Sequence, residues 1–227
     1  ERGKKDLRLY RNPVLESGKN AGDQGKSTAS LRENGAENRF VFRVFKKEGT
    51  VMHYAEIKTC DIANGPGVRV TLFVSGCTHR CQNCFNEETW DFHYGKPFTE
   101  ETENSLLNAL RPAYIKGLTL LGSEPLEHSN QQGLLPFIRR VKRELPEKDI
   151  WCYTGYTFET DVLGRMCTEW KETKELLSCL DVLVDGEFVQ ELKHMGIRFR
   201  GSSNQRIIRV GESLREGKTV LWDEDKE

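Results

Sequence analysis

Residues 76–86 read GCTHRCQNCFN, and this stretch places Cys77, Cys81 and Cys84 in the spacing C-x3-C-x2-C. Residues 68–74, directly before it, read VRVTLFV, an apolar and β-branched run. Such a run predicts a buried strand. The three cysteines are therefore expected on a loop that leaves the carboxyl end of a strand, where α/β folds place their chemistry.

Three thiolates on one short loop can converge on a metal centre. A structural zinc site usually has four ligands, whereas an iron–sulfur cubane takes one cysteine per iron. Three cysteines would thus hold a [4Fe-4S] cluster and leave one iron open, as a reactive site requires. We expect His79 to be a loop or partner-facing residue, because a fourth ligand would close that iron. Two alternatives stay open: a zinc loop with His79 or Cys60 as fourth ligand, and three unrelated thiols.

The C-x3-C-x2-C spacing after a strand resembles the signature of the radical S-adenosylmethionine enzymes. The neighbouring sequence sharpens this resemblance towards the glycyl-radical-enzyme activases, and within them towards those that activate anaerobic ribonucleoside-triphosphate reductase. The similarity covers about residues 52–208, and its separate motifs occur in the family's order. They are DIANGPGVR at 61–69, LFVSGC at 72–77, CFN at 84–86 with TW at 89–90, KDIW at 148–151, TGY at 154–156, DVLVDG at 181–186 and RGSSNQ at 200–205.

The resemblance implies a [4Fe-4S] cluster on Cys77, Cys81 and Cys84, with S-adenosylmethionine bound at the open iron. It also implies that the cofactor is contacted from the third cysteine with its neighbours and from a turn after a later strand, through Asn83, Cys84, Phe85, Gly122, Ser123 and Glu124. The turn reads GSEP here, where the family carries Gly-Gly-Asp/Glu-Pro, and Asn83 stands where close relatives often have glycine. Serine adopts a positive φ less readily than glycine, so Ser123 is a departure that bears on close backbone approach.

The function implied by the resemblance is activation of anaerobic ribonucleoside-triphosphate reductase. S-adenosylmethionine would be reductively cleaved at the cluster, and a glycyl radical would form on the reductase. The implied partners are the glycyl radical subunit of that reductase and a low-potential electron donor such as flavodoxin. Two other functions stay open: activation of another glycyl radical enzyme of the formate-lyase type, and a non-catalytic zinc-binding module. The short sequence after residue 52, without an added ferredoxin-like cluster domain, favours the reductase.

Strand and helix patterns alternate from residue 68 onwards. Strands are expected at residues 68–74, 118–121, 150–153, 182–184 and 207–210, and helices at 99–110, 134–145, 160–166 and 171–179. This alternation predicts an α/β fold with parallel strands, and the resemblance specifies a partial (β/α)6-type barrel over a domain at residues 52–227. Residues 1–51 are polar and are predicted to form a largely disordered extension, with a short strand at residues 39–46.

The composition describes a polar protein with 37% hydrophobic and 30% charged residues and a net charge of −1. A net charge near zero provides no overall electrostatic attraction to nucleic acid, so we do not expect nucleic-acid binding. No apolar run is long enough to span a membrane and no signal peptide is recognised, so we expect a cytoplasmic protein. Seven cysteines, three of them clustered, argue against a disulfide framework. Cys152, Cys167 and Cys179 are expected to be small buried side chains.

Overall fold

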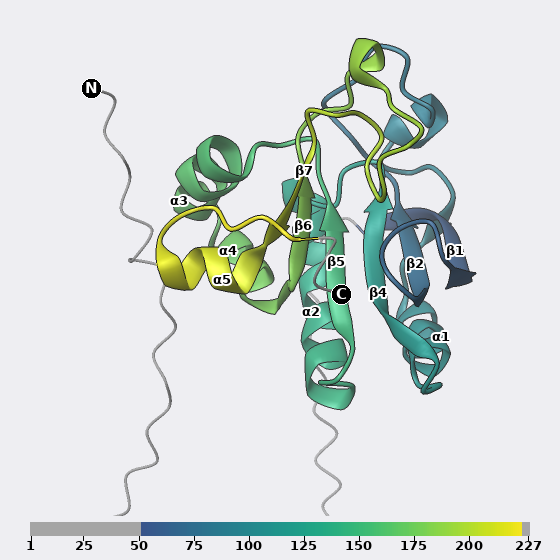
Figure 1. The fold of residues 1–227 in the computed structure, drawn as a ribbon. Helices are drawn as coiled ribbons and strands as arrows, with labels where there is room; N and C mark the ends of the chain where they lie inside the picture. Colours follow the sequence, from purple (N-terminus) through teal and green to yellow (C-terminus); the bar gives the residue numbers. More distant parts are fainter. Residues whose placement is uncertain (1–50, 224–227) are drawn as a thin grey trace, which may run out of the picture. The chain divides into compact units, whose positions relative to one another are not determined.

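The computed structural model describes residues 51–223. A seven-stranded sheet forms the centre of this part of the chain (Figure 1). Its strands are β1 (His53–Asp61), β2 (Val68–Val74), β3 (Lys96–Pro97), β4 (Ile115–Gly122), β5 (Asp149–Tyr153), β6 (Val182–Asp185) and β7 (Arg206–Arg209). Apart from its last residue, the predicted extension over residues 1–51 lies outside the described residues, and so does the strand predicted at residues 39–46.

The strands lie in the order β3-β1-β2-β4-β5-β6-β7. The middle four, β2, β4, β5 and β6, are parallel to one another, as the alternation of strands and helices predicted. β2 occupies residues 68–74 as expected, β4, β5 and β6 extend the predicted ranges by one to a few residues, and β7 lies one residue earlier than predicted. The sheet is therefore a mixed α/β sheet with a parallel centre.

Three pairs of neighbouring strands are antiparallel, so the expectation of a wholly parallel sheet is wrong for these pairs. β1 pairs antiparallel with β2, β3 with β1, and β7 with β6. Residues 62–67 alone join β1 to β2, and a connection this short permits only antiparallel neighbours, because a parallel pair needs a crossover of a dozen or more residues. β7 returns beside β6 through residues 186–205, which carry only the short helical turn η4 (Gln190–Leu192).

The helices bury their apolar side chains against one face of the sheet. They are α1 (Glu100–Leu110), α2 (His128–Glu144), the π-helical η3 (Phe158–Met166), α3 (Cys167–Glu169), α4 (Lys171–Cys179) and α5 (Val210–Glu216), with a short turn η2 (Glu87–Trp90) before β3. Thr99 caps α1 as predicted, and its hydroxyl accepts a hydrogen bond from Thr102 N. The sequence did not predict β1, β3 or α5, and α5 begins at Val210, which was expected to end a strand.

Alternate residues of the central strands point to opposite faces of the sheet. On the helix-covered face, side chains such as Leu72, Leu120 and Cys152 join one large buried cluster. On the other face, Trp151 of β5 packs edge-on against Phe199 and Trp222, with ring centroids 5.6 Å apart in each pair. Phe199 belongs to the segment between β6 and β7, so this segment folds back over the face that the helices leave free.

Arg69 is a charged residue buried within β2, on the face opposite the helices, and its side chain is 0% exposed. Its Nε donates to Thr119 Oγ1 at 2.7 Å, and its Nη2 donates to Leu118 O at 2.9 Å. Nη2 also lies 2.5 Å from Asp149 Oδ1. The guanidinium therefore links β2, β4 and β5, and these partners offset the cost of burying it.

Replacing Arg69 with methionine should lower the free energy of unfolding by about 3–5 kcal/mol, because Asp149 and the neighbouring acceptors lose their partner. Guanidinium chloride unfolding followed by circular dichroism measures the loss. Arg111→Met is a matched control, because Arg111 is 56% exposed and lies 3.7 Å from Glu144. Loss of such a surface pair should cost at most about 1 kcal/mol. Equal losses in the two variants would contradict the role given to Arg69.

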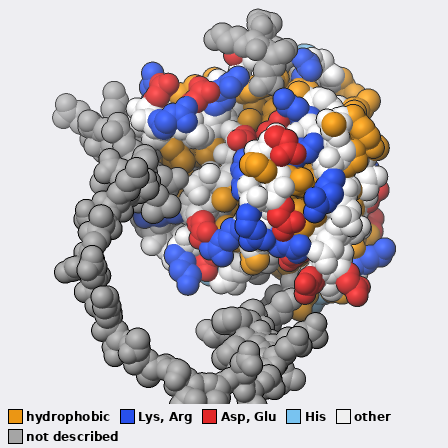
Figure 2. Space-filling view, turned by 90° about the horizontal axis from the view of Figure 1, so that it is seen from below, with side chains coloured by type: hydrophobic (Ala, Val, Ile, Leu, Met, Phe, Trp, Pro, Cys, Tyr) orange, Lys and Arg blue, Asp and Glu red, His pale blue; other side chains and the backbone are white. Residues whose placement is uncertain are grey.

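The surface seen from below carries charges of both signs (Figure 2). Lys and Arg side chains are interspersed there with Asp and Glu, in agreement with the net charge of −1. That face therefore has no broad field of one sign. Among residues 51–223, no helix has both the length and the apolar character needed to cross a membrane.

Candidate metal and cofactor site

A pocket lies where the parallel strands end, between the cysteine stretch and the segment that joins β6 to β7. Its walls come from the cysteine stretch, the turn after β4, the end of β5 and the β6–β7 segment. The predicted site residues among them are Cys77, Cys81, Cys84, Phe85, Gly122, Ser123 and Glu124. The fold thus brings into one pocket two motifs that are far apart in the sequence, and the wall includes every predicted site residue except Asn83.

Backbone hydrogen bonds hold the cysteine stretch where it leaves β2. Gly76 N donates to Thr89 O at 2.8 Å, and Cys77 N donates to Trp90 O at 3.1 Å. Both acceptors belong to η2, the turn that follows the third cysteine. These bonds join the start of the loop, at Gly76 and Cys77, to its end at Thr89 and Trp90. Cys81 and Cys84 lie between the two ends.

Asn83 has a φ of 61°, which places its backbone in the left-handed region. Asparagine adopts this conformation more readily than most non-glycine residues. The left-handed conformation at this position therefore does not require glycine. Its side chain is exposed, so any contact that it makes in the pocket would come from its backbone.

Phe85 lies at the rim of the pocket and is 70% exposed. Its ring centroid is 5.5 Å from that of Phe188, and Lys193 Nζ lies 4.7 Å from the ring centroid. Both neighbours belong to the β6–β7 segment. The ring therefore packs on that segment rather than on the sheet, and it leaves an apolar surface at the pocket entrance.

Three cysteine side chains line the pocket, and a [4Fe-4S] cubane takes one cysteine per iron, so these residues are a donor set for three of its irons. Among residues 51–223, no group of three Cys, His, Asp or Glu side chains is arranged to hold a single metal ion. Cys60 is exposed on β1, next to Asp61, which pairs with Arg69 near the start of β2. It is therefore remote from the cysteine stretch and is not a fourth ligand.

The thiols of the first two cysteines are partly buried. Burial raises the pKa of Cys77 to about 11, and burial together with the neighbouring Glu187 raises the pKa of Cys81 to about 12. The metal ligand is the thiolate, so loading this pocket with iron has to release protons.

Gly122 is the residue in the turn after β4 that needs an unusual backbone conformation. Its φ is 109°, and a Cβ there would lie 2.7 Å from Val74 O. Ser123 is not among the described non-glycine residues with positive φ. Its hydroxyl donates to Thr89 O, and its backbone N–H donates to Val74 O at 3.0 Å. The serine is thus compatible with the turn, and its hydroxyl fastens the turn to η2.

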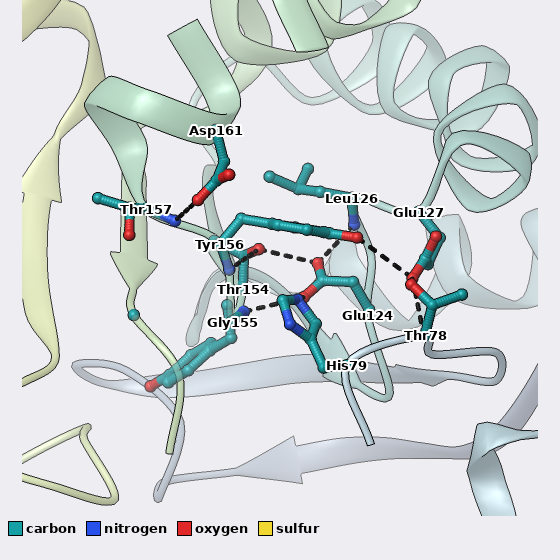
Figure 3. Close-up of polar contacts among 12 residues, drawn as sticks. Thr78, His79, Glu124, Leu126, Glu127, Thr154, Gly155, Tyr156, Thr157 and Asp161 are labelled. Atoms are coloured by element: carbon teal, nitrogen blue, oxygen red, sulfur yellow. Dashed lines mark hydrogen bonds and ion pairs between the residues drawn. The ribbon is translucent and has the colours of Figure 1, made fainter. Parts of the chain in front are cut away.

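Glu124 lies in the wall of the pocket and is 1% exposed. Its Oε1 accepts from Leu126 N at 2.8 Å and from Thr154 Oγ1 at 2.9 Å, and its Oε2 accepts from Gly155 N at 2.8 Å. This carboxylate therefore joins the turn after β4 to the TGY motif at the end of β5 (Figure 3).

His79 is a loop residue, one of the two positions expected for it, and its largely buried side chain lies in the pocket wall. Its Nε2 lies 3.3 Å from Glu124 Oε2, and its ring centroid lies 4.2 Å from that of Tyr156. The neighbouring Glu124 carboxylate raises the pKa of His79. Figure 3 shows the imidazole beside the carboxylate and the tyrosine ring. His79 thus anchors the cysteine loop to the sheet end.

Glu127 makes a second connection of this kind, which the sequence did not reveal. It accepts from Thr78 N at 2.8 Å, from the Thr78 hydroxyl, and from the Tyr156 hydroxyl at 3.3 Å (Figure 3). A glutamate at the start of a helix usually indicates helix capping. Here its side chain makes no capping hydrogen bond to the helix.

The segment between β6 and β7 closes one side of the pocket. Gly186, Phe188, Gly201 and Gln205 contribute to the wall. Gln205 Nε2 donates to Gly186 O at 2.9 Å, and its Oε1 accepts from Gly201 N at 2.8 Å. The RGSSNQ motif, for which the sequence suggested no role beyond a solvated loop, therefore ties this segment together at the pocket.

The remaining cysteines lie apart from the pocket wall. Cys152 and Cys167 are buried in the core, as predicted. Cys179 is only partly buried and packs against the same core. Of the seven cysteines, these three thus behave as small apolar side chains.

The fold and the pocket define an α/β protein with a three-cysteine loop at the carboxyl edge of a parallel sheet centre. Residues 63–208 match the family model described as a 4Fe-4S single cluster domain. With this match and with the similarity to curated proteins reported next, the chain belongs to the family of anaerobic ribonucleoside-triphosphate reductase-activating proteins.

Three relatives with that name illustrate the similarity. The protein from Haemophilus influenzae is 45% identical over 160 residues, which are 70% of this chain and 98% of the relative. The protein from Escherichia coli (strain K12) is 42% identical over 158 residues, 69% of this chain and 97% of the relative. The protein from Enterobacteria phage T4 is 42% identical over 156 residues, 69% of this chain and 93% of the relative. The similarity supports an activating protein with an iron–sulfur centre.

Proposed function

We propose that this protein activates anaerobic ribonucleoside-triphosphate reductase by reductive cleavage of S-adenosylmethionine at a [4Fe-4S] cluster, which generates a glycyl radical on the reductase. The observation that carries the proposal is the pocket in which three cysteines face the turn Gly122–Glu124. Three cysteines leave one iron of a cubane without a protein ligand, and the turn lies in the same pocket to receive what binds that iron.

The residues of the pocket would have two roles, which are to hold the cluster and to orient the cofactor. Cys77, Cys81 and Cys84 hold the cluster as thiolates, and the turn Gly122–Glu124 with the backbone around Asn83 and Phe85 orients the cofactor. When bound, cluster and cofactor supply the chemistry: one electron breaks the C5′–S bond of S-adenosylmethionine, and a hydrogen atom is then taken from a glycine of the reductase. The β6–β7 segment limits the access of water from one side.

The reductase and an electron donor are the partners of this proposal. Glycine suits radical formation because it has no Cβ, so its α-radical can be planar and delocalised over the flanking amides. A low-potential donor such as flavodoxin would reduce the cluster. We further propose that the sheet forms a partial (β/α)6-type barrel, whose gap would admit a loop of the reductase, and that residues 52–227 constitute the activase domain.

The alternative functions receive less support. The names of the relatives favour the reductase over a partner of the formate-lyase type. The match to a 4Fe-4S family model favours a cluster over a zinc-binding module. A zinc module would contain one equivalent of zinc and no sulfide, so metal and sulfide analysis of anaerobically purified protein separates the two.

The experiment that tests the proposal is anaerobic mixing of this protein with a candidate reductase, S-adenosylmethionine and a reductant. We expect an organic radical signal on the reductase by electron paramagnetic resonance, together with release of methionine. A brown, iron-loaded protein that gives neither product with its reductase would contradict the proposed reaction while leaving the cluster in place.

A chain that starts at Met52 should keep the iron content and the activity of the full chain. Met52 is buried and its carbonyl accepts from Phe98 N at 2.7 Å, so the packed structure already includes this residue. The relatives are covered almost completely by about 70% of this chain. Iron per chain and radical yield measure the outcome. An unfolded or inactive truncated protein would show that residues 1–51 complete the fold.

A further inference from the structure

The first half of the cysteine loop is fastened to the sheet end through two successive residues. His79 approaches Glu124, and its neighbour Thr78 is bonded to Glu127. Figure 3 shows both carboxylates between the cysteine loop and the end of β5. Glu124 belongs to the turn already placed in the cofactor pocket. Glu127 is different, because it does not line that pocket, yet it bonds to the residue next to a cluster ligand.

The side chain of Glu127 accepts hydrogen bonds from Thr78 and does not cap its own helix, α2. Oε1 accepts from the backbone N–H of Thr78 at 2.8 Å and also from the Thr78 hydroxyl. The Tyr156 hydroxyl donates to the same oxygen at 3.3 Å, and burial raises the pKa of Tyr156 to about 12, which keeps it a neutral donor. Glu127 is 8% exposed. A carboxylate this buried is stabilised by the donors around it, so the arrangement is rigid.

The connection reaches Cys77 through a single peptide unit. The N–H that Glu127 fixes belongs to the peptide bond between Cys77 and Thr78, so holding it sets the orientation of the cysteine's carbonyl and limits where its thiol can lie. Hydrogen bonds to the groups beside a metal ligand orient that ligand and tune the metal. The charge of the carboxylate would also act on the centre, because net charge and hydrogen bonds set iron–sulfur potentials.

We propose that Glu127 is a positioning residue that acts through Thr78 to fix Cys77 for cluster binding, and that its negative charge keeps the reduction potential of the cluster low. This inference rests on the proposed function, because it requires that Cys77 ligates a cluster. The Glu127 side chain would thus contribute in two ways. The acceptor oxygen fixes the geometry of the loop, and the charge sets the potential.

The test compares Glu127→Leu with Glu127→Gln in the full chain, reconstituted anaerobically with iron and sulfide. Leucine removes both the acceptor and the charge, and chelator should bleach its cluster about tenfold faster or more than that of the unaltered protein. Glutamine keeps an acceptor for Thr78 but no charge, so its cluster should bleach close to the normal rate while its reduction potential becomes more positive. Absorbance decay and a redox titration measure the two properties.

Three further measurements make the result specific to Glu127 and Thr78. Glu147→Leu removes a carboxylate that is 61% exposed and distant from the loop in sequence, and it should change neither property. The Glu127 side chain makes no capping bond to α2, so circular dichroism of cluster-free Glu127→Leu should show the normal helix content. Thr78→Val removes the hydroxyl but keeps the N–H, and its bleaching rate should lie between those of the two Glu127 variants.

The outcomes distinguish this inference from the proposed function. If the unaltered protein binds iron and Glu127→Leu matches it in bleaching rate and potential, the positioning role is wrong while the proposed function stands. If Glu127→Gln bleaches as fast as Glu127→Leu, the acceptor geometry is not what matters and the inference also fails. If the unaltered protein binds no iron and sulfide, the proposed function itself is wrong, and this inference falls with it.

Discussion

Alanine in place of Cys77, Cys81 or Cys84 is expected to abolish cleavage of S-adenosylmethionine. Each thiolate would hold one iron, so the loss of one leaves a second iron without a protein ligand and the cluster does not persist in its four-iron form. We expect iron and sulfide per chain to fall to a small fraction of the normal content, and methionine release to fall to background. Iron and sulfide analysis and anaerobic turnover measure both losses.

Cysteines outside the pocket provide the controls for these variants. Cys152→Ala and Cys179→Ala should leave the cluster content nearly unchanged, because both side chains pack against the core. Cys60→Ala tests the zinc alternative, and the exposed position of Cys60 on β1 predicts no effect. Full iron content in Cys81→Ala would defeat the assignment of the three ligands, since a cluster retained without Cys81 must be held by other groups.

Local signals in the sequence predicted the elements that carry the cysteines. The apolar run at residues 68–74 is a strand buried within the sheet, so its pattern did not depend on a particular neighbour. Thr99 with acidic residues in the following turn marked the start of α1, because capping is a local interaction. The position of the cysteine loop follows from the strand alone, because a loop that follows a parallel strand leaves the sheet at its carboxyl edge.

Non-local pairings could not be predicted in the same way. β1 has an exposed and mixed residue pattern, and it becomes a strand because it lies beside β2. The β6–β7 segment carries no periodic pattern, yet Phe199 from it packs against Trp151 and Gln205 bonds to Gly186. Such contacts depend on which parts of the chain meet in space, and propensity does not encode them.

The same distinction applies within the candidate site. The spacing of the cysteines and the GSEP turn were visible as motifs, and the fold brought them into one pocket. The bond between Glu127 and Thr78 was not visible, because it joins residues from different motifs. The concern over Ser123 came from a family pattern with two glycines, and it is resolved because only Gly122 needs a positive φ.

The proposed cluster, with one iron that has no protein ligand, allows a direct spectroscopic prediction. If S-adenosylmethionine becomes a ligand of that iron, adding it must change the electron paramagnetic resonance of the reduced cluster, because the electronic structure of the cluster depends on its ligands. A cofactor bound only nearby would change the resonance little. An unchanged resonance under conditions of saturating binding would remove the ligation from the proposal while leaving the cluster itself.

Ser123→Phe is expected to weaken binding of S-adenosylmethionine by about tenfold or more, which corresponds to about 1.4 kcal/mol or more. Ser123 lies in the pocket wall between Gly122 and Glu124, and a phenyl ring there would occupy space that the cofactor needs. It would also break the hydrogen bond from the hydroxyl to Thr89 O. Cluster assembly should be intact, because the turn supplies no iron ligand. Equilibrium binding of the cofactor to the iron-loaded protein measures the change.

Ser123→Ala separates the two effects of that substitution. Alanine removes the hydrogen bonds of the Ser123 hydroxyl to Thr89 O and to the Thr89 hydroxyl but leaves the pocket open. Each such bond contributes about 1 kcal/mol to the stability of the turn, and neither contacts the cofactor, so we expect the affinity to stay within a few-fold of normal. If Ser123→Ala weakens cofactor binding as much as Ser123→Phe does, the hydrogen bonds between the turn and η2 determine the affinity, and the free space beside Ser123 does not. If phenylalanine binds the cofactor normally, the turn does not belong to the cofactor site, and the cysteine loop alone carries the proposed function.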